Sequence, residues 1–461
     1  MNAEQAYLFR HALLRDAAYE LQLPATRAAL HELVLEVLEA QFGGTPPEKP
    51  DKGIWHAADQ WATELVLHAR IANKHRPSPR LALAMRTYVR RAALQSERSY
   101  RLRDALLFWR EHAALVDPPE RLQSLRNAAV CALDAGLVSE ARTATAALIE
   151  CAQATENAAA LGDALQMRGN FHLYSSEPEL AIESYSSALE HLRSAGAERS
   201  AAIVHSNRAI ALHQLERHVE AEHEYHTALA LHRRLGNRRV EGNTLGNLAR
   251  LLHALGDREG SLRMTLEALA IHRETGNRRF EGIALGNLGV DEARYGNNEH
   301  AGELLRQALA IHLEVSNLTF VAEVSNSLAT WHLRRSEFAE AEQYLKQSIE
   351  VSSETGNQRA YALSLSNRAE LYSATGEIAA ADELFPKALE LCIRQGGVLS
   401  GLYVECSAAV HSIRARRIDI ARQQWADAGA RIKLHGEPPD FSTVRDEMRR
   451  ACLAAGIVPF E

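Results

Sequence analysis

The most constraining feature of this chain is that it repeats itself every forty residues. Gly236 opens the segment GNRRVEGNTLGNLARL, and Gly276 opens GNRRFEGIALGNLGVD forty residues later. A related segment, GNQRAYALSLSNRAEL, starts at Gly356. A fixed period of about 20–50 residues is typical of chains in which one small structural unit stacks on the next. The period therefore predicts a stack of similar units and not one globular core.

Each unit is predicted to contain two helices. In residues 236–275, apolar residues recur at helical spacing from about residue 239 to 254 and again from 259 to 275. Gly256 is expected to end the first helix, because glycine adopts the left-handed backbone there without steric cost. Asp257 can cap the second helix by accepting hydrogen bonds from its free backbone N–H groups. Such a pair cannot bury its apolar face alone, so each unit must pack on its neighbours.

Small residues recur in both helices, where the sequence predicts close helix contacts. The first helix holds Ala93, Ala129, Gly169, Ala209, Ala249, Gly289, Ala329, Ala369 and Ala409. Twelve residues later come Ala105, Ala141, Ala181, Ala221, Ser261, Ala301, Ala341, Ala381 and Ala421. A bulky residue follows four positions further on in most units, as at Tyr185 and Tyr225. Helix axes approach to about 8 Å only where the side chains between them are small.

This arrangement resembles the tetratricopeptide repeat, which pairs a small residue in its first helix with an alanine, an aromatic residue and another alanine in its second. The family's usual unit has about 34 residues. A forty-residue unit indicates helices about one turn longer, as in the branch similar to kinesin light chains and many bacterial signalling proteins. The resemblance covers about residues 81–430. It implies an all-α fold, a right-handed α-solenoid of about nine helix pairs.

The two ends, residues 1–80 and 431–461, do not follow the repeat. The first is predicted to be a small N-terminal helical module with a linker, and the last a segment that caps the array. Residues 9–19 (FRHALLRDAAY) resemble the stretch that precedes the repeats in bacterial signal-transduction ATPases. This resemblance implies the sensor arm of a larger regulator, or a relative that lacks the motor. The sequence contains neither a GxxxxGK[ST] phosphate-binding loop nor the kinase motifs.

Composition narrows the functional class further. An apolar share of 46% with 24% charged residues excludes a disordered chain. A net charge of −7 and the lack of a reader motif disfavour nucleic acid as a partner. No run of eighteen apolar residues occurs, so no membrane span is expected. The five cysteines form no CxxC pair, and a cytoplasmic location is expected.

An asparagine recurs at one position of the first helix and is the leading candidate for ligand binding. In the family that the chain resembles, this position faces the inner, concave surface. An amide offers two donors and an acceptor, so a row of them could hold the backbone of an extended peptide. The alternative is that each asparagine only bridges adjacent repeats. The position holds Asn207, Asn247, Asn287 and Asn367, while Ser327 replaces it in one unit, where Asn326 is adjacent.

Basic residues are expected to lie near this asparagine row. Residues 231–280 contain 10 Lys/Arg and 5 Asp/Glu, which makes this window positive within an acidic chain. A basic groove would favour acidic peptide segments or a C-terminal carboxylate, because arginine pairs with carboxylates through two hydrogen bonds. The alternative is a solvated surface of mixed charge. The candidates are Arg250, Arg294, Arg334, His213 and His253.

The sequence offers no constellation for catalysis, for a cofactor or for a metal. His223-Glu-Tyr-His226 is one residue short of the HExxH spacing, and no GxSxG elbow occurs. His232, His272 and His312 share one repeat position, which indicates a role common to the units.

These observations predict a non-catalytic protein- or peptide-binding scaffold or sensor arm in bacterial-type signal transduction, with an ATPase or kinase among its partners. The alternative is the C-terminal regulatory fragment of a signal-transduction ATPase or kinase that controls an NTP switch.

Overall fold

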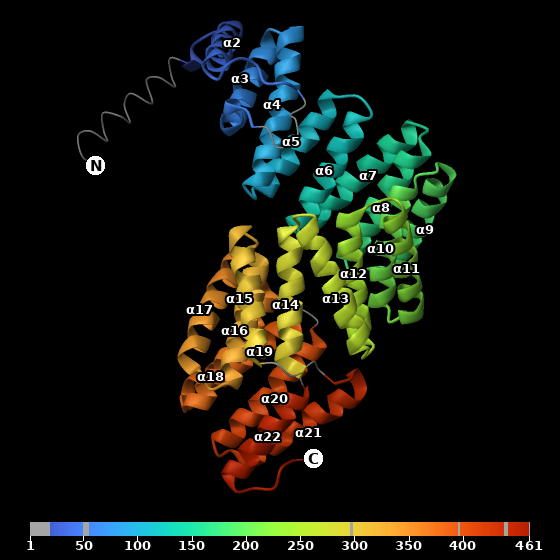
Figure 1. Ribbon diagram of the computed structural model, residues 1–461. Helices are drawn as coiled ribbons and strands as arrows, with labels where there is room; N and C mark the ends of the chain where they lie inside the picture. The colour runs from blue at the N-terminus through green and yellow to red at the C-terminus, as the bar shows by residue number, and fades with distance from the viewer. Residues whose placement is uncertain (1–18, 49–54, 296–297, 395–396, 438–440, 461) are drawn as a thin grey trace, which may run out of the picture. The chain divides into compact units, whose positions relative to one another are not determined.

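The computed structural model describes residues 19–48, 55–295, 298–394, 397–437 and 441–460 (Figure 1). Within these residues the chain forms α-helices and one short 3₁₀-helix, and no strand, which confirms the predicted all-α fold. The chain divides into two compact units, residues 1–235 and 236–461. No helix in the described part of the chain is long and apolar enough to cross a bilayer. The segment 9–19 lies outside the described residues, apart from Tyr19.

Unit 1 begins with the N-terminal helices and continues as helix pairs. Its elements are α2 (Pro24–Gln41), η1 (Ala57–Trp61), α3 (Ala62–His75), α4 (Pro79–Arg98), α5 (Leu102–Leu115), α6 (Glu120–Asp134), α7 (Val138–Ala154), α8 (Ala158–Tyr174), α9 (Pro178–Ser194), α10 (Glu198–Gln214) and α11 (His218–Arg234).

Unit 2 consists of five further helix pairs and one closing helix. Its elements are α12 (Arg238–Ala254), α13 (Arg258–Glu274), α14 (Arg278–Tyr295), α15 (Asn298–Glu314), α16 (Leu318–Arg334), α17 (Phe338–Thr355), α18 (Gln358–Thr375), α19 (Ile378–Arg394), α20 (Val398–Arg414), α21 (Ile418–His435) and α22 (Phe441–Ala455). The predicted domain limits at residues 80 and 430 stay a prediction.

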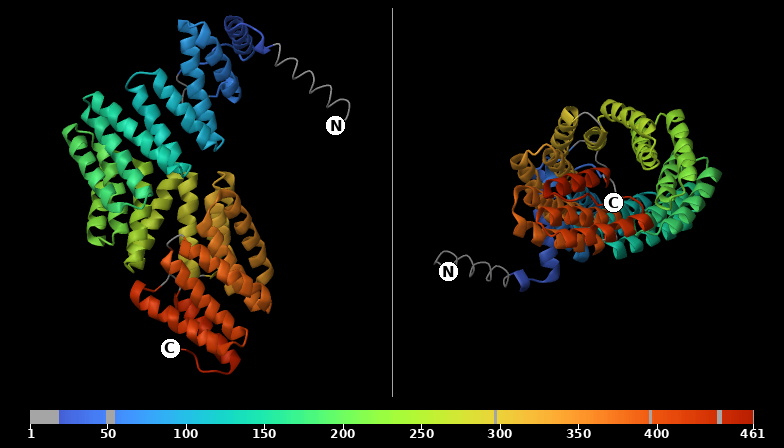
Figure 2. Two further views of the ribbon diagram at one scale, coloured as in Figure 1. Left: turned by 180° about the vertical axis from the view of Figure 1, so that it is seen from behind. Right: turned by 90° about the horizontal axis from the view of Figure 1, so that it is seen from below.

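The first helices of successive pairs gather on one side of each stack. Within unit 2, α14 contacts α16, α16 contacts α18, and α18 contacts α20. Within unit 1, α6 contacts α8 and α8 contacts α10 in the same way. Among the described residues, the second helices of successive pairs make no comparable contacts. The first helices therefore form the inner side of each stack, whose helix pairs can be followed from two further directions in Figure 2.

Turns recur every twenty residues and set the length of the helices. From α6 onward, a left-handed residue follows each helix whose closing turn the structure describes, beginning at Gly136 and Glu156 and continuing at the same interval. Gly256, with φ of 80°, ends α12 as predicted. The carboxylate of Asp257 caps α13 by accepting a hydrogen bond of 2.9 Å from the backbone N–H of Gly260. Two such twenty-residue segments make the forty-residue unit.

Replacing Glu216 with glycine is expected to stabilise unit 1. Glu216 has a left-handed φ of 58°, and most of the equivalent described turns have glycine at this position. Glu216→Gly should raise the free energy of unfolding by about 1 kcal/mol. Gly196→Ala, at the equivalent turn with φ of 63° and no neighbouring atoms around a new Cβ, should lower it by a similar amount. Thermal melts of the two variants test both predictions, a higher melting temperature for Glu216→Gly and a lower one for Gly196→Ala. A Glu216→Gly variant that melts below the parent would contradict the first prediction.

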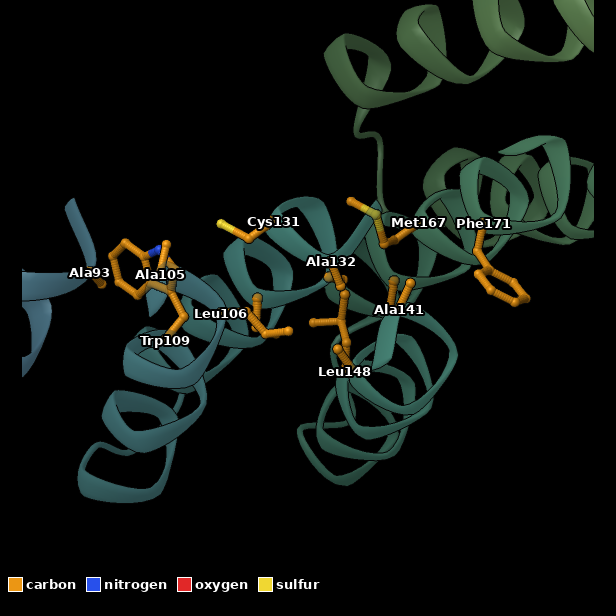
Figure 3. Packing of buried hydrophobic residues seen from close by; sticks show 14 of the residues in the cluster. Ala93, Ala105, Leu106, Trp109, Cys131, Ala132, Ala141, Leu148, Met167 and Phe171 are labelled. Atoms are coloured by element: carbon orange, nitrogen blue, oxygen red, sulfur yellow. The ribbon is translucent and has the colours of Figure 1, made fainter. Parts of the chain in front are cut away.

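Small residues lie where the predicted helix contacts occur. A Cβ added to Gly169 would lie 2.3 Å from Cε1 of Tyr185, so only glycine fits against that ring. Figure 3 shows the same kind of packing earlier in unit 1, where Ala105 and Trp109 lie beside Ala93 in one buried cluster. These contacts let the two helices of one pair pack closely against each other.

The histidines that share a repeat position are buried in the helix packing. His272 and His312 expose 2% and 0% of their surface. The side-chain amide of Asn317 lies 3.3 Å from Nδ1 of His312, and the ring of Phe320 stacks on the imidazole. Burial lowers the pKa of His312 to about 4, with a smaller effect from Arg279, and burial also lowers the pKa of His272. These imidazoles are therefore neutral in the folded protein near neutral pH.

Unit 2 is expected to lose stability in acid because of these histidines. The folded-state pKa of His312 lies below its unfolded value of 6.5, so the unfolded chain binds the proton first. The stabilisation is complete above pH 6.5 and should fall by roughly 3 kcal/mol on going to pH 4. His312→Leu should make the dependence of unfolding free energy on pH shallower by about one proton. The exposed His300, replaced by leucine, is the control; equal slopes in the His312 variant and the parent would contradict this account.

The N-terminal and C-terminal helices differ in what they bury. In α2, the apolar stripe of Leu30, Leu33, Val34 and Val37 is 39–57% exposed, while Leu35 is buried. The closing helix α22 instead buries Phe441, Val444, Met448 and Cys452 in a cluster with α20 and α21. This helix lies within residues 431–461, the segment that the sequence analysis expects to cap the array.

Candidate functional site

The inner side of unit 2 contains a cavity of about 460 Å³, here called the inner cavity. Four first helices, α14, α16, α18 and α20, supply nearly all of its wall, and α15 adds one leucine. The lining residues are Val290, Ala293, Arg294, Leu305, Asn326, Ser327, Thr330, Trp331, Arg334, Arg359, Leu363, Asn367, Leu399, Ser400 and Tyr403. Four predicted site residues, Asn326, Asn367, Arg294 and Arg334, thus meet in one place.

Two asparagines bridge α16 and α18 in this wall. The amide nitrogen of Asn367 donates to Oδ1 of Asn326 at 2.9 Å and to the Thr330 hydroxyl at 3.0 Å. Ser364 donates to the same Asn326 oxygen at 3.1 Å. Within the described residues, this leaves the amide hydrogens of Asn326 and the side-chain oxygen of Asn367 without a partner. The two asparagines therefore join the repeats and still present one donor group and one acceptor to the cavity.

This donor and acceptor match the needs of a peptide group. A peptide bond carries one C=O acceptor and one N–H donor, and both must be satisfied when it is buried. Asn367 is 5% exposed, so a ligand that fills the cavity would be held in a largely dehydrated place, where hydrogen bonds count most.

Arginines give the inner cavity a positive charge. Arg294, Arg334 and Arg359 line it, and no carboxylate is among the described lining residues. Arg294 Nη1 lies 3.1 Å from Nε2 of His253, and Arg334 Nη1 donates to the backbone oxygen of Ala293 at 3.4 Å. Guanidinium groups in a cavity wall can attract an anionic group of a ligand.

Apolar side chains complete the cavity. Trp331 and Tyr403 supply aromatic surface, and Leu363 of α18 and Leu399 of α20 add aliphatic surface. Trp331 is 6% exposed, and the guanidinium of Arg335 lies 4.9 Å from the centre of its ring. A wall with many apolar groups and a few placed polar groups is the usual composition of a ligand site.

The structure places the other predicted residues outside the inner cavity. In α12, Asn247 accepts a hydrogen bond of 2.9 Å from Arg250, and His253 lies 3.7 Å from the carboxylate of Asp291. Asn287 is exposed on α14. These positions stay predictions as ligand contacts.

Two of the predicted residues, Asn207 and His213, belong to unit 1. Asn207 donates to Oδ1 of Asn170 at 3.0 Å, and Tyr185 donates to the same oxygen at 2.8 Å. The ring of His213 meets that of His218 edge-on, with centroids 5.7 Å apart. The amide bridge between repeats therefore occurs in both units.

The predicted arginines do not form one row. Arg294 and Arg334 share a repeat position and both line the inner cavity, whereas Arg250 is offset by four residues and is exposed. One turn of helix separates the two registers, which moves the side chain along the helix.

Sequence reasoning missed several residues of the inner cavity, namely Thr330, Trp331, Arg359, Leu363 and Tyr403. Arg359 shares a repeat position with Arg239 and Arg279, so a signal for it was present. The others do not recur from unit to unit, and a periodic pattern cannot indicate them.

Comparison with protein families shows which class of repeat this is. Residues 200–274, 242–314 and 320–394 match the tetratricopeptide repeat. The chain therefore contains tetratricopeptide repeats, as the alanine and glycine positions predicted. No curated protein matches the sequence.

Solved structures share the fold at low sequence identity. The apo form of the quorum sensor NprR from B. thuringiensis superposes with a TM-score of 0.52 at 14% identity, over 74% of this chain and 96% of that one. A signal transduction ATPase with numerous domains and a tetratricopeptide repeat sensor, from Pyrococcus horikoshii, gives a TM-score of 0.50 at 15% identity. That match covers 73% of this chain but only 53% of the ATPase.

Proposed function

We propose that this chain is a non-catalytic binding protein whose inner cavity in unit 2 holds a segment of a peptide or protein partner. The observation that carries the proposal is the Asn326–Asn367 pair, which presents a donor group and an acceptor after satisfying its contacts between helices. Arg294, Arg334 and Arg359 would favour an acidic side chain or a terminal carboxylate next to the bound backbone.

The signalling part of the proposal rests on the named roles of proteins with the same fold. One is a quorum sensor, and the other contains a tetratricopeptide repeat sensor attached to an ATPase. By analogy, we assign this chain a sensor or scaffold role in bacterial-type signal transduction, in the cytoplasm, with an ATPase or kinase as the regulated partner. The alternative, a regulatory fragment of such an ATPase, predicts that nucleotide turnover by a co-expressed ATPase changes when this chain is added.

Selection of binding peptides tests the proposed function. A displayed library of random peptides would be panned against the full chain. Enriched peptides should contain acidic residues or depend on a free C-terminus, and they should compete with one another for one site. Enrichment of peptides that bind an Asn326→Ala variant as tightly as the parent would count against the inner cavity as their site.

A further inference from the structure

A second cavity, of about 640 Å³, lies at the C-terminal end of unit 2. The closing helix α22 forms one wall, and the ends of α16, α18 and α20 with their turns form the other. We call it the terminal cavity. Its volume is within the range of about 300–1,000 Å³ that small-molecule sites occupy.

The terminal cavity carries an excess of positive charge. Arg334, Arg414, Arg416 and Arg450 line it, with Glu447 as the one acidic residue in the described wall. Glu370 lies close to Arg414, but burial, with Glu447 nearby, raises its pKa to about 7. This carboxyl group therefore loses part of its negative charge at neutral pH and compensates the arginines only in part.

Three of these arginines form no ion pair with a carboxylate of the described residues. Arg414 donates to the Ser373 hydroxyl at 3.4 Å, Arg416 to the backbone oxygen of Ala455 at 3.3 Å, and Arg450 to the backbone oxygen of Asp446 at 3.4 Å. These are long hydrogen bonds to uncharged oxygens.

Other arginines in this region of the chain are paired differently. Arg417 binds both oxygens of Asp382 at 2.6 Å, and Arg445 binds Glu437 at 2.9 Å. The lack of carboxylate partners is therefore a property of the cavity and not of this end of the chain.

Helix ends alone do not explain the cluster. A cation near the C-terminus of a helix is favoured by the backbone dipoles, and this accounts for Arg414 in the last turn of α20. Arg450 is not in the last turn of α22, which contains no basic residue. Arg416 lies beyond the end of α20.

We propose that the terminal cavity binds a phosphorylated small molecule of about nucleotide size. Guanidinium groups bind phosphate oxygens through paired, charge-assisted hydrogen bonds. Arg414, Arg416 and Arg450 supply these groups from two helices and a turn. Ser336 and Thr375 add hydroxyl groups, and Phe338, Ile378 and the alanines of α22 offer an apolar surface for the body of the ligand. This site shares only Arg334 with the lining of the proposed peptide site, and its test uses other residues.

Calorimetric titration of the full chain tests the proposal, with ADP as a phosphorylated probe and adenosine as the same body without phosphate. ADP should bind saturably and raise the melting temperature, and adenosine should bind at least about tenfold more weakly. Arg450→Gln and Arg414→Gln should each weaken ADP about tenfold. Arg449→Gln is the matched control, because Arg449 is the neighbouring exposed arginine of α22 and does not line the cavity.

Three results would overturn the proposal. The first is the absence of saturable ADP binding, and the second is equal affinity for ADP and adenosine. The third is that Arg450→Gln and Arg414→Gln both bind ADP as tightly as the parent while melting at the same temperature. Citrate, a carboxylate anion, should bind more weakly than ADP, and equal binding would also refute a phosphate site.

Discussion

Replacing Ala301 with tryptophan is expected to destabilise unit 2 by about 3 kcal/mol or more. Ala301 lies on α15, is 0% exposed, and belongs to the buried cluster that joins α13 through α16. It holds the second small position of the repeat. On the neighbouring helix, a Cβ added to Gly289 would lie 2.8 Å from Cγ of Leu305, so the helices leave no space for a larger group. An indole there must push the packed helices apart.

The matched control for this substitution is Ala379→Trp, on the exposed side of α19. It adds the same side chain to unit 2 but should leave the free energy of unfolding within about 0.5 kcal/mol of the parent. Urea unfolding followed by circular dichroism compares the two. If the Ala301 variant unfolds at the same urea concentration as the parent, the assignment of small residues to helix contacts is wrong.

Replacing Asn326 with alanine is expected to weaken a panned peptide about tenfold to hundredfold. The change removes the amide hydrogens that face the inner cavity and also the acceptor for Asn367 and Ser364. Some loss of stability should accompany it. Fluorescence titration gives the affinity, since Trp331 lines the cavity and should report its occupation.

Two further variants separate binding from stability. Asn326→Asp keeps the acceptor oxygen and the size of the side chain but removes the donors, so it should weaken binding while retaining the bridge to α18. Asn287→Ala changes an exposed asparagine at the repeat position of Asn367, outside the inner cavity, and should weaken binding less than Asn326→Ala does. Equal peptide affinity in the parent, Asn326→Ala and Asn326→Asp would contradict the proposed contacts.

The repeated part of the fold was predictable from the sequence, because the same packing problem recurs in each unit. Ala181 and Ala221 are small for the same reason, so their recurrence shows where helices touch. The capping role of Asp257 and the turn at Gly256 were likewise predictable, since they depend on local chemistry.

The sites were less predictable because they arise where the units differ. The other units have no threonine at the repeat position of Thr330 and no tyrosine at that of Tyr403. The two side chains meet in the inner cavity because of how its four first helices stack. Asn326 lines the inner cavity, although in this unit the repeat position that holds asparagine elsewhere is occupied by Ser327. The terminal cavity depends on α22 packing against α20, a contact that no local pattern specifies.

Cross-linking from a bound peptide tests the central claim most directly. A panned peptide that carries a photoreactive phenylalanine analogue would be irradiated with the full chain, and the adduct located by mass spectrometry. Attachment to α16, α18 or α20, at residues of the inner cavity such as Leu363 or Tyr403, is the expected result. Attachment to the second helices α17 and α19, or to unit 1, would contradict the assignment of the inner cavity as the peptide site.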